Sequence, residues 1–278
     1  MRFLLALLIA FLAAPVGVTP ADPRAVILAT TTSTQDSGLL DVLVPMFERR
    51  TGYRVKTIAV GTGQALTMGA RGEADVVLVH APQLERNYLD SGDLVARRLV
   101  MHNDFVIVGP AADPAGVKRV RIAIAAMKAI AAKEAPFVSR GDNSGTHAKE
   151  KALWSAAAVT VKAPWYLESG QGMGATLAIA SERQAYTLTD RATYLAFKKR
   201  VDLAILLEGD APLLNVYHVM EINPNKHPRI NVAGGKAFAD FIVSAEAQGA
   251  ISAFGVQTYG QPLFFPDAGK PEPATGSR

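Results

Sequence analysis

Short apolar runs alternate with amphipathic stretches along most of this chain. The runs at 25–29, 53–60 and 74–79 have the length and composition of buried strands, and a stretch with helical spacing of apolar residues follows each of them. This alternation predicts an α/β fold with a parallel sheet and crossover helices. Pro45 lies inside the first of these helices, and we expect it to kink the helix or to end its first part.

The second half of the chain continues the same pattern. Strands are predicted at 105–108, 137–139, 185–188, 203–207 and 216–222, and helices at 116–134, from about 148 to 157, and at 174–184, 190–199 and 235–254. The closing helix has no strand after it and must pack on the first part of the molecule. We therefore predict two α/β lobes with a ligand cleft between them and two hinge crossings, near residues 109 and 215. Lobe I comprises 22–108 and 216–278, and lobe II comprises 109–215.

The first residues have the character of an export signal. Met1-Arg2 gives a positive start, 3–14 is an unbroken apolar run, and small residues follow up to Ala21. This run is shorter than the roughly 20 residues that span a bilayer as a helix. We predict a secretory signal peptide over 1–21 and a periplasmic mature protein. An uncleaved membrane anchor is the alternative.

Composition removes several classes of function. The chain has no cysteine, which excludes disulfides, thiolate metal sites and cysteine nucleophiles. The formal net charge of +4 over 278 residues is a mild excess, and the basic clusters lack interleaved aromatic residues. We therefore expect no nucleic-acid partner. No His-Glu-x-x-His motif is present, so no catalytic zinc site is predicted.

Three polar loops follow three predicted strands, each just before a helix. The first is Thr30-Thr31-Thr32-Ser33-Thr34, the second Gly61-Thr62-Gly63-Gln64, and the third runs from Arg140 to Thr146. In parallel α/β sheets such loops meet in the cleft at the carboxyl ends of the strands. Helix starts also present free N–H groups that attract anions. Together the loops predict a pocket rich in hydrogen-bond donors with one strong cation, although each hydroxyl alone is commonly a helix cap.

Four sequence blocks carry a family resemblance. They are the hydroxyl run at 30–34, VGTGQA at 60–65, SRGDNSGTH at 139–147 and YTLTDR at 186–191. In this order they closely resemble the tungstate-binding periplasmic proteins of ABC importers, over nearly the whole mature chain. The resemblance implies the type II periplasmic-binding-protein fold. It implies a ligand-binding set of Thr31, Ser33, Thr62, Arg140, Ser144, Gly145, Thr146 and, less securely, Arg191, whose side chain can equally face solvent.

The same resemblance implies a binding protein with no enzyme activity. Its ligand would be tungstate, with molybdate as a second candidate, and no resident metal or other cofactor is expected. Its partner would be the membrane permease of an ABC importer with its ATPase, and the protein itself would be a monomer. The Arg-x-Asp-x-Ser-Gly-Thr core of the third loop is also similar to periplasmic phosphate-binding proteins, so that block alone indicates only a tetrahedral oxyanion.

The chemistry of the loops ranks the oxyanions. Tungstate and molybdate have no proton to donate at neutral pH, so a site made only of donors suits them. Hydrogen phosphate carries an O–H that a carboxylate would accept, and the carboxylates of interest are Asp36, Asp142 and Asp190. Asp142 is expected to pair with Arg140. Phosphate or sulfate remains the second interpretation. A secreted hydrolase is the third, because Ser144 and His147 lie close in sequence, although no Gly-x-Ser-x-Gly motif is present.

Overall fold

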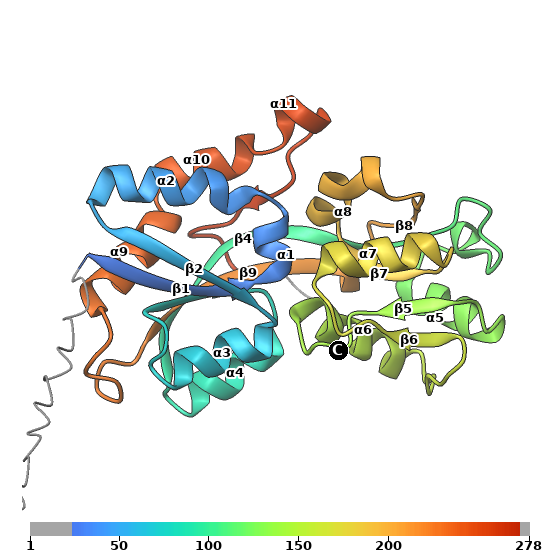
Figure 1. Ribbon diagram of the computed structural model, residues 1–278, viewed down its shortest axis with the longest axis horizontal. Coiled ribbons are helices and arrows are strands. Elements are labelled where there is room, and N and C mark those ends of the chain that lie inside the picture. The colour runs from blue at the N-terminus through green and yellow to red at the C-terminus, as the bar shows by residue number, and fades with distance from the viewer. Residues whose placement is uncertain (1–23, 273–278) are drawn as a thin grey trace, which may run out of the picture.

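A computed structural model describes residues 24–272 of the chain. Eight strands form one mixed sheet and two short strands form a second, parallel pair (Figure 1). The predicted leader over 1–21 lies outside the described residues. Among the residues that are described, no helix has the length and apolar character needed to cross a membrane.

The first half of the sheet is built as the sequence predicts. Strands β2, β1 and β3 are parallel neighbours, and β9 then pairs antiparallel with both β3 and β4. The bounds of the strands are β1 Ala25–Thr31, β2 Arg54–Val60, β3 Val76–Val79, β4 Leu94–Gly109, β5 Phe137–Ser139, β6 Tyr166–Glu168, β7 Thr187–Asp190, β8 Ala204–Leu207, β9 Leu214–Ile222 and β10 Phe265–Pro266.

Helices cover both faces of this sheet. Their bounds are α1 Thr32–Asp36, α2 Leu39–Thr51, α3 Thr62–Ala70, α4 Pro82–Asp90, α5 Ala123–Ala132, α6 Gly145–Ala156, α7 Met173–Glu182, α8 Arg191–Phe197, α9 Val232–Ile242, α10 Ala245–Ala253 and α11 Val256–Tyr259. Short 3-10 turns lie at Val117–Arg119, Lys198–Arg200 and Ala211–Leu213.

Strand β4 joins the two halves of the molecule. Its first part pairs with β9, and its last part pairs with β7 and β8 (Figure 1). Successive side chains of a strand point to opposite faces. Phe105 and Ile107 accordingly pack with α5 and α6, while Val106 and Val108 pack with α7 and α8.

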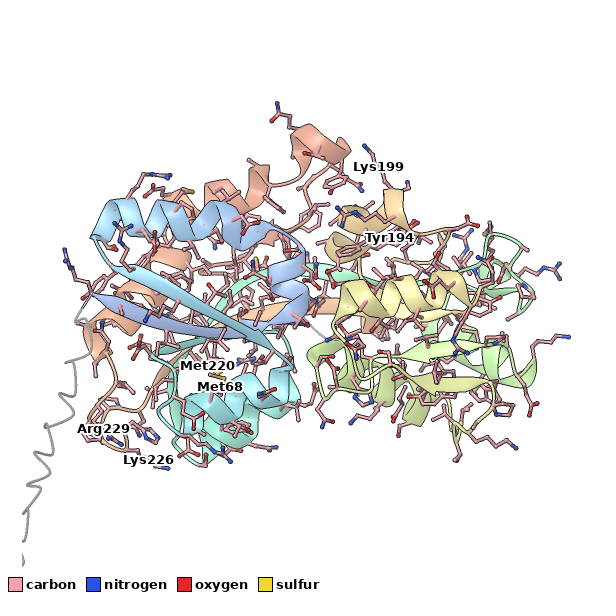
Figure 2. The ribbon with its side chains drawn as sticks, viewed as in Figure 1. Met68, Tyr194, Lys199, Met220, Lys226 and Arg229 are labelled. Atoms are coloured by element: carbon pink, nitrogen blue, oxygen red, sulfur yellow. The ribbon has the colours of Figure 1, made fainter. Side chains whose placement is uncertain are left out.

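The apolar cores follow this division of the sheet. One pair of clusters uses β1, β3 and β9 with α2, α9 and α10 on one face and α3 on the other. Met68 of α3 and Met220 of β9 lie together on the α3 side (Figure 2). A second pair of clusters is built from residues between Phe105 and Leu213. The lobe boundaries proposed from the sequence stay a prediction. Residues 105–108, which that prediction places in lobe I, pack in the second pair of clusters.

Several local expectations differ from the structure. Helix α2 does not end at Pro45 but continues to Thr51, and the missing N–H of Pro45 leaves the carbonyl of Asp41 without its helical hydrogen bond. The predicted helix 116–134 is a 3-10 turn followed by α5. The closing helix is two helices, because Ser244 caps α10 with its hydroxyl. Thr32 to Thr34 of the hydroxyl run belong to the short helix α1. This helix was not predicted because it has no apolar residues at helical spacing.

Candidate functional site

The three polar loops meet at the junction between the two halves of the molecule. Thr31 ends β1 and caps α1, Thr62 begins α3 after β2, and Gly145 begins α6 after β5. In Figure 1, α1 and the start of α3 face the elements that follow β5. The backbone N–H of Gly63 donates to the carbonyl oxygen of Asn143 at 3.2 Å, so the second and third loops touch directly.

Arg140 is the one cation of the predicted set that is almost fully buried, with 1% of its surface exposed. Its Nε donates to the carbonyl oxygen of Gln171 at 2.9 Å, and its Nη2 donates to Thr32 Oγ1 at 3.0 Å. Nη2 also forms an ion pair with Asp142, which confirms the pairing expected from the sequence. Asp142 in turn accepts from the backbone N–H of Ser144 at 3.1 Å and thereby fixes the third loop.

The other terminal nitrogen of Arg140 has no hydrogen-bond partner among the described residues. Nη1 is buried, and so are the hydroxyls of Thr62 and Thr146, which also have no hydrogen-bond partner in the part of the chain that is described. A guanidinium stays protonated in proteins, so its free N–H groups cannot be neutralised by loss of a proton. Buried polar groups without partners are unfavourable by about 1–3 kcal/mol each, and by more when charged. An anion that accepts from these donors would remove that penalty.

The hydroxyls of the first loop are also buried and lie close to one another. Thr31 Oγ1 is 3.1 Å from Ser33 Oγ and accepts from the backbone N–H of Thr34 at 3.2 Å. The backbone carbonyl of Ser33 accepts from Thr193 Oγ1 of α8 at 3.2 Å. Arg140 reaches this loop through Thr32. The structure therefore brings Thr31, Ser33 and Arg140 to one place.

The absence of a side chain at Gly145 allows the loops to approach one another closely. A Cβ on Gly145 would lie 2.8 Å from the ring of His80 and 3.1 Å from Thr62 Oγ1. Glycine is therefore required here for close approach of the chain. Beside this point a hollow of about 1030 Å³ opens between the two halves. Its lining includes His80, Asp142, Gly145 and Lys149.

Ser144 and Arg191 have different surroundings from those of the central group. Ser144 caps α6, with its hydroxyl accepting from the backbone N–H of His147 at 3.2 Å. Nδ1 of His147 accepts from the backbone N–H of Asn143, and the side chains of Ser144 and His147 form no hydrogen bond with each other in the described region. Arg191 donates from Nε to Asp104 at 2.7 Å and pairs with Glu208 at 2.5 Å. Its contacts thus join it to an acidic pair, and a ligand-binding role for Arg191 stays a prediction.

The three carboxylates singled out in the sequence are placed differently. Asp142 is engaged by Arg140, and Asp36, at the end of α1, accepts from the backbone N–H of Gly174 at 3.4 Å. Asp190 caps α8 through Oδ1, while its buried Oδ2 has no partner in the region described. Burial raises the pKa of Asp190 to about 6, and the nearby charge of Arg140 acts in the opposite direction.

His80 belongs to the site although no sequence pattern selects it. It follows β3, is 3% exposed, and lies 3.0 Å through Nε2 from Thr31 Oγ1 and 3.1 Å from Ser33 Oγ. Burial lowers the pKa of His80 to about 4. A single histidine after a strand has no local pattern that marks it, so only the three-dimensional structure reveals this contact.

Glu150 of α6 supports the third loop from below. It is 1% exposed, and its Oε1 accepts from Trp154 Nε1 at 3.1 Å and from the Tyr166 hydroxyl at 2.8 Å. Burial raises the pKa of Glu150 from 4.5 to about 7, and these hydrogen bonds offset only part of that shift. In the folded protein Glu150 is therefore mostly protonated only below about pH 7.

This shift predicts a pH-dependent stability. Because the folded-state pKa exceeds the unfolded value, the stabilisation is fully present below about pH 4.5 and is lost as pH rises through about 7. Glu150→Gln keeps an acceptor oxygen without the charge. We expect its melting temperature to fall less than that of the wild type between about pH 5 and about pH 8. The corresponding difference in the free energy of unfolding is on the order of 3 kcal/mol at most. If the melting temperatures of both proteins change with pH in the same way, the raised pKa of Glu150 is contradicted.

Comparison with known proteins places this architecture in a class. A PBP superfamily domain matches residues 18–246, and the chain belongs to that superfamily. The type II periplasmic-binding-protein fold inferred from the sequence is confirmed at this level. Among the described residues, no three His, Asp or Glu side chains are grouped to hold a bare metal ion.

More similar relatives define the particular group. The tungstate-binding protein TupA of Peptoclostridium acidaminophilum is 49% identical over 247 residues, which are 88% of this chain and 86% of that protein. The TupA of Campylobacter jejuni is 39% identical over 85% of this chain and 88% of its own length. The resemblance drawn from the four sequence blocks is confirmed.

Solved structures agree with these relatives. The crystal structure described as the tungstate ABC transporter from Geobacter sulfurreducens is 50% identical, with a TM-score of 0.76, and covers 83% of this chain and 98% of that one. The tungstate-binding protein TupA from Desulfovibrio alaskensis G20 is 44% identical, with a TM-score of 0.73, over 88% of this chain and 99% of that one.

Proposed function

We propose that this protein binds tungstate in the periplasm and delivers it to the permease of an ABC importer. The observation that carries the proposal is the buried Nη1 of Arg140, which has no hydrogen-bond partner among residues 24–272, accompanied by the hydroxyls of Thr62 and Thr146, which have none there either. These groups are donors, as a fully deprotonated tetrahedral dianion requires. The similarity to proteins named for tungstate supplies the identity of the ion.

The proposed ligand set has Arg140 as its charge and three loops as its walls. Thr31 and Ser33 would donate hydroxyl hydrogens from the first loop, and Thr62 and Thr146 from the starts of α3 and α6. The backbone N–H groups of Gly145 and its neighbours would add donors at a helix N-terminus. About six preorganised donors of this kind are compatible with nanomolar binding, about −12 kcal/mol.

The cellular parts of the proposal follow from the same assignment. Removal of the predicted leader over 1–21 would release a monomeric protein into the periplasm. A binding protein of this kind needs no resident cofactor and no catalytic group, and we propose no enzyme activity. Its protein partners would be the importer's permease and, through it, the ATPase.

Phosphate is the second candidate because of Asp190. Its buried Oδ2 has no hydrogen-bond partner in the described chain, and an ionised carboxylate there would accept the proton of hydrogen phosphate. A protonated Asp190 would instead donate to tungstate or molybdate. The raised pKa of Asp190, about 6 before any ligand is present, favours the protonated form once a dianion arrives.

Competition calorimetry on the mature protein separates these candidates. We expect tungstate to bind with the highest affinity, molybdate to compete with it, and phosphate and sulfate to be at least about a hundredfold weaker, a difference of about 2.7 kcal/mol. The melting temperature should rise in the same order, because a ligand that binds only the folded state stabilises it. Tight phosphate binding that survives in the presence of tungstate would reject the proposal.

A further inference from the structure

The ring of His80 is held between the first loop and strand β9. It stacks on Tyr217, with 4.6 Å between ring centroids and 27° between planes. Nε2 points to the hydroxyls of Thr31 and Ser33, and the edge with Cε1 and Nδ1 faces Gly145. His80 therefore touches the first loop and the start of α6.

Asn215 determines which ring nitrogen of His80 carries the proton. Nδ1 of His80 is 2.8 Å from Asn215 Oδ1. The amide nitrogen of Asn215 donates to Asn103 Oδ1 at 2.7 Å and to the Tyr217 hydroxyl at 3.1 Å, so the amide oxygen is the atom that faces His80. An amide oxygen only accepts, hence Nδ1 carries a hydrogen. The neutral ring then has Nε2 as an acceptor.

This arrangement conflicts with anion binding if His80 remains neutral. Each hydroxyl of Thr31 and Ser33 has one hydrogen to donate. In the structure these hydrogens can satisfy Nε2, but an oxyanion in the site requires the same hydrogens. Neutral Nε2 would then be a buried acceptor without a donor, close to a dianion. A hydrogen on Nε2 removes the conflict, because Nε2–H donates to a hydroxyl oxygen whose own hydrogen turns to the ligand.

We propose that His80 takes up one proton when a divalent oxyanion binds, and that the protonated ring holds the Thr31 and Ser33 hydroxyls as donors to the ion. The proposal rests on the oxyanion-binding function above and adds a residue and a proton to it. One covalent bond forms, Nε2–H of His80, and its proton is released by water or the buffer; all other changes are in hydrogen bonds.

The charges around His80 explain why the ligand would control this proton. Burial is the largest cause of its low pKa, and Arg140 and Lys149 act in the same direction. Glu85 of α4 and the hydrogen bond to Asn215 act in the opposite direction. The empty site thus holds a neutral ring near pH 7. A dianion would compensate the positive charge of Arg140 and raise the pKa of His80.

The sign of the pH dependence follows from this shift. A group whose pKa is higher in the complex binds a proton together with the ligand. Tungstate affinity should therefore fall as pH rises, by up to about tenfold per pH unit between the pKa values of the empty and the filled site. Asp190 can contribute a proton in the same way, since its pKa is also raised, so the two groups must be tested separately.

Calorimetry with sodium tungstate in buffers of different ionisation enthalpy measures the proton uptake. At about pH 6 we expect His80 to contribute close to one proton per ion in the wild type, in addition to any uptake by Asp190, and the total to be smaller at about pH 8. The nitrogen NMR signals of the His80 ring should change on tungstate binding at about pH 6 from one protonated nitrogen to two. A ring that stays neutral in the complex overturns the proposal, even when tungstate binds tightly.

Three variants complete the test. His80→Gln supplies a neutral amide donor, and it should lose the proton uptake and flatten the pH dependence while still binding tungstate. Asp190→Asn should keep the uptake that belongs to His80. His102→Gln removes a histidine that pairs with Asp267 away from the site, and it should behave as the wild type. Uptake that survives in His80→Gln and disappears in Asp190→Asn would reject His80, whereas the lack of any tungstate heat in the wild type would reject the binding function itself.

Discussion

Arg140→Ala is expected to weaken tungstate binding by about 2–5 kcal/mol, or about 30-fold to several thousandfold. The substitution removes the buried positive charge of the site and the Nη1 donors, which no described residue engages. It also leaves Asp142 without its partner, so a negative charge would remain near the incoming dianion. Both effects lower the affinity for tungstate, so their contributions add.

Calorimetry of Arg140→Ala and of Arg140→Lys tests which property of the arginine matters. The lysine variant keeps a charge but cannot contact Gln171, Thr32 and the ligand at once from a planar fork. We expect it to bind tungstate more weakly than the wild type and more strongly than the alanine variant. Arg50→Ala, which removes an exposed ion pair with Glu246, is the matched control. An unchanged affinity in Arg140→Ala would remove this residue from the site.

The sequence was sufficient to locate most of the candidate site because its loops obey a local rule. Thr31, Thr62 and Arg140 each lie where a strand ends and a helix begins, so their positions could be predicted without knowledge of distant contacts. The pairing of Arg140 with Asp142 was also predictable, since only one residue separates them in the sequence. Patterns of this kind involve residues that are close together in the chain, and any sequence that forms this topology contains them.

Other parts of the site depend on residues far apart in the chain. His80 gains its orientation from Asn215, which is 135 positions away. Arg191 begins α8 in a pattern like that of Arg140, but it meets Asp104, which is 87 positions away. No local pattern distinguishes an arginine that faces a ligand from one that faces a carboxylate. The contacts of His80 and Arg191 could therefore be identified only from the three-dimensional structure.

Strand β4 is longer than the strand that the sequence predicts at 105–108, and long-range contacts are the reason. Residues 94–104 of β4 carry Arg97 and Arg98, whose charges argue against a strand inside a sheet. In the structure Arg98 pairs with Glu221 on the neighbouring β9 and with Asp240 on α9. Both partners come from the last quarter of the chain, and their compensation of the charge was not visible locally.

Gly61→Ala should reduce tungstate affinity by at least about tenfold, which corresponds to about 1.4 kcal/mol, without unfolding the protein. Gly61 has φ −66° and ψ 149°, a conformation that alanine adopts freely. An added Cβ would nevertheless lie 2.7 Å from the backbone carbonyl oxygen of Asp142, a contact too short to persist. Gly61 belongs to predicted lobe I and Asp142 to predicted lobe II, so the clash opposes their approach rather than the fold of either.

Separation of these two loops would move the start of α3 away from the start of α6. Thr62 and Thr146 would then no longer donate to one ion, and the contact between Gly63 and Asn143 would be lost. We expect small-angle scattering to show compaction of the wild type with tungstate and a smaller change in Gly61→Ala. Gly249→Ala, in α10 where a Cβ meets no atom within 4 Å, controls for the substitution itself. Wild-type affinity in Gly61→Ala would mean that the bound protein does not use this close contact.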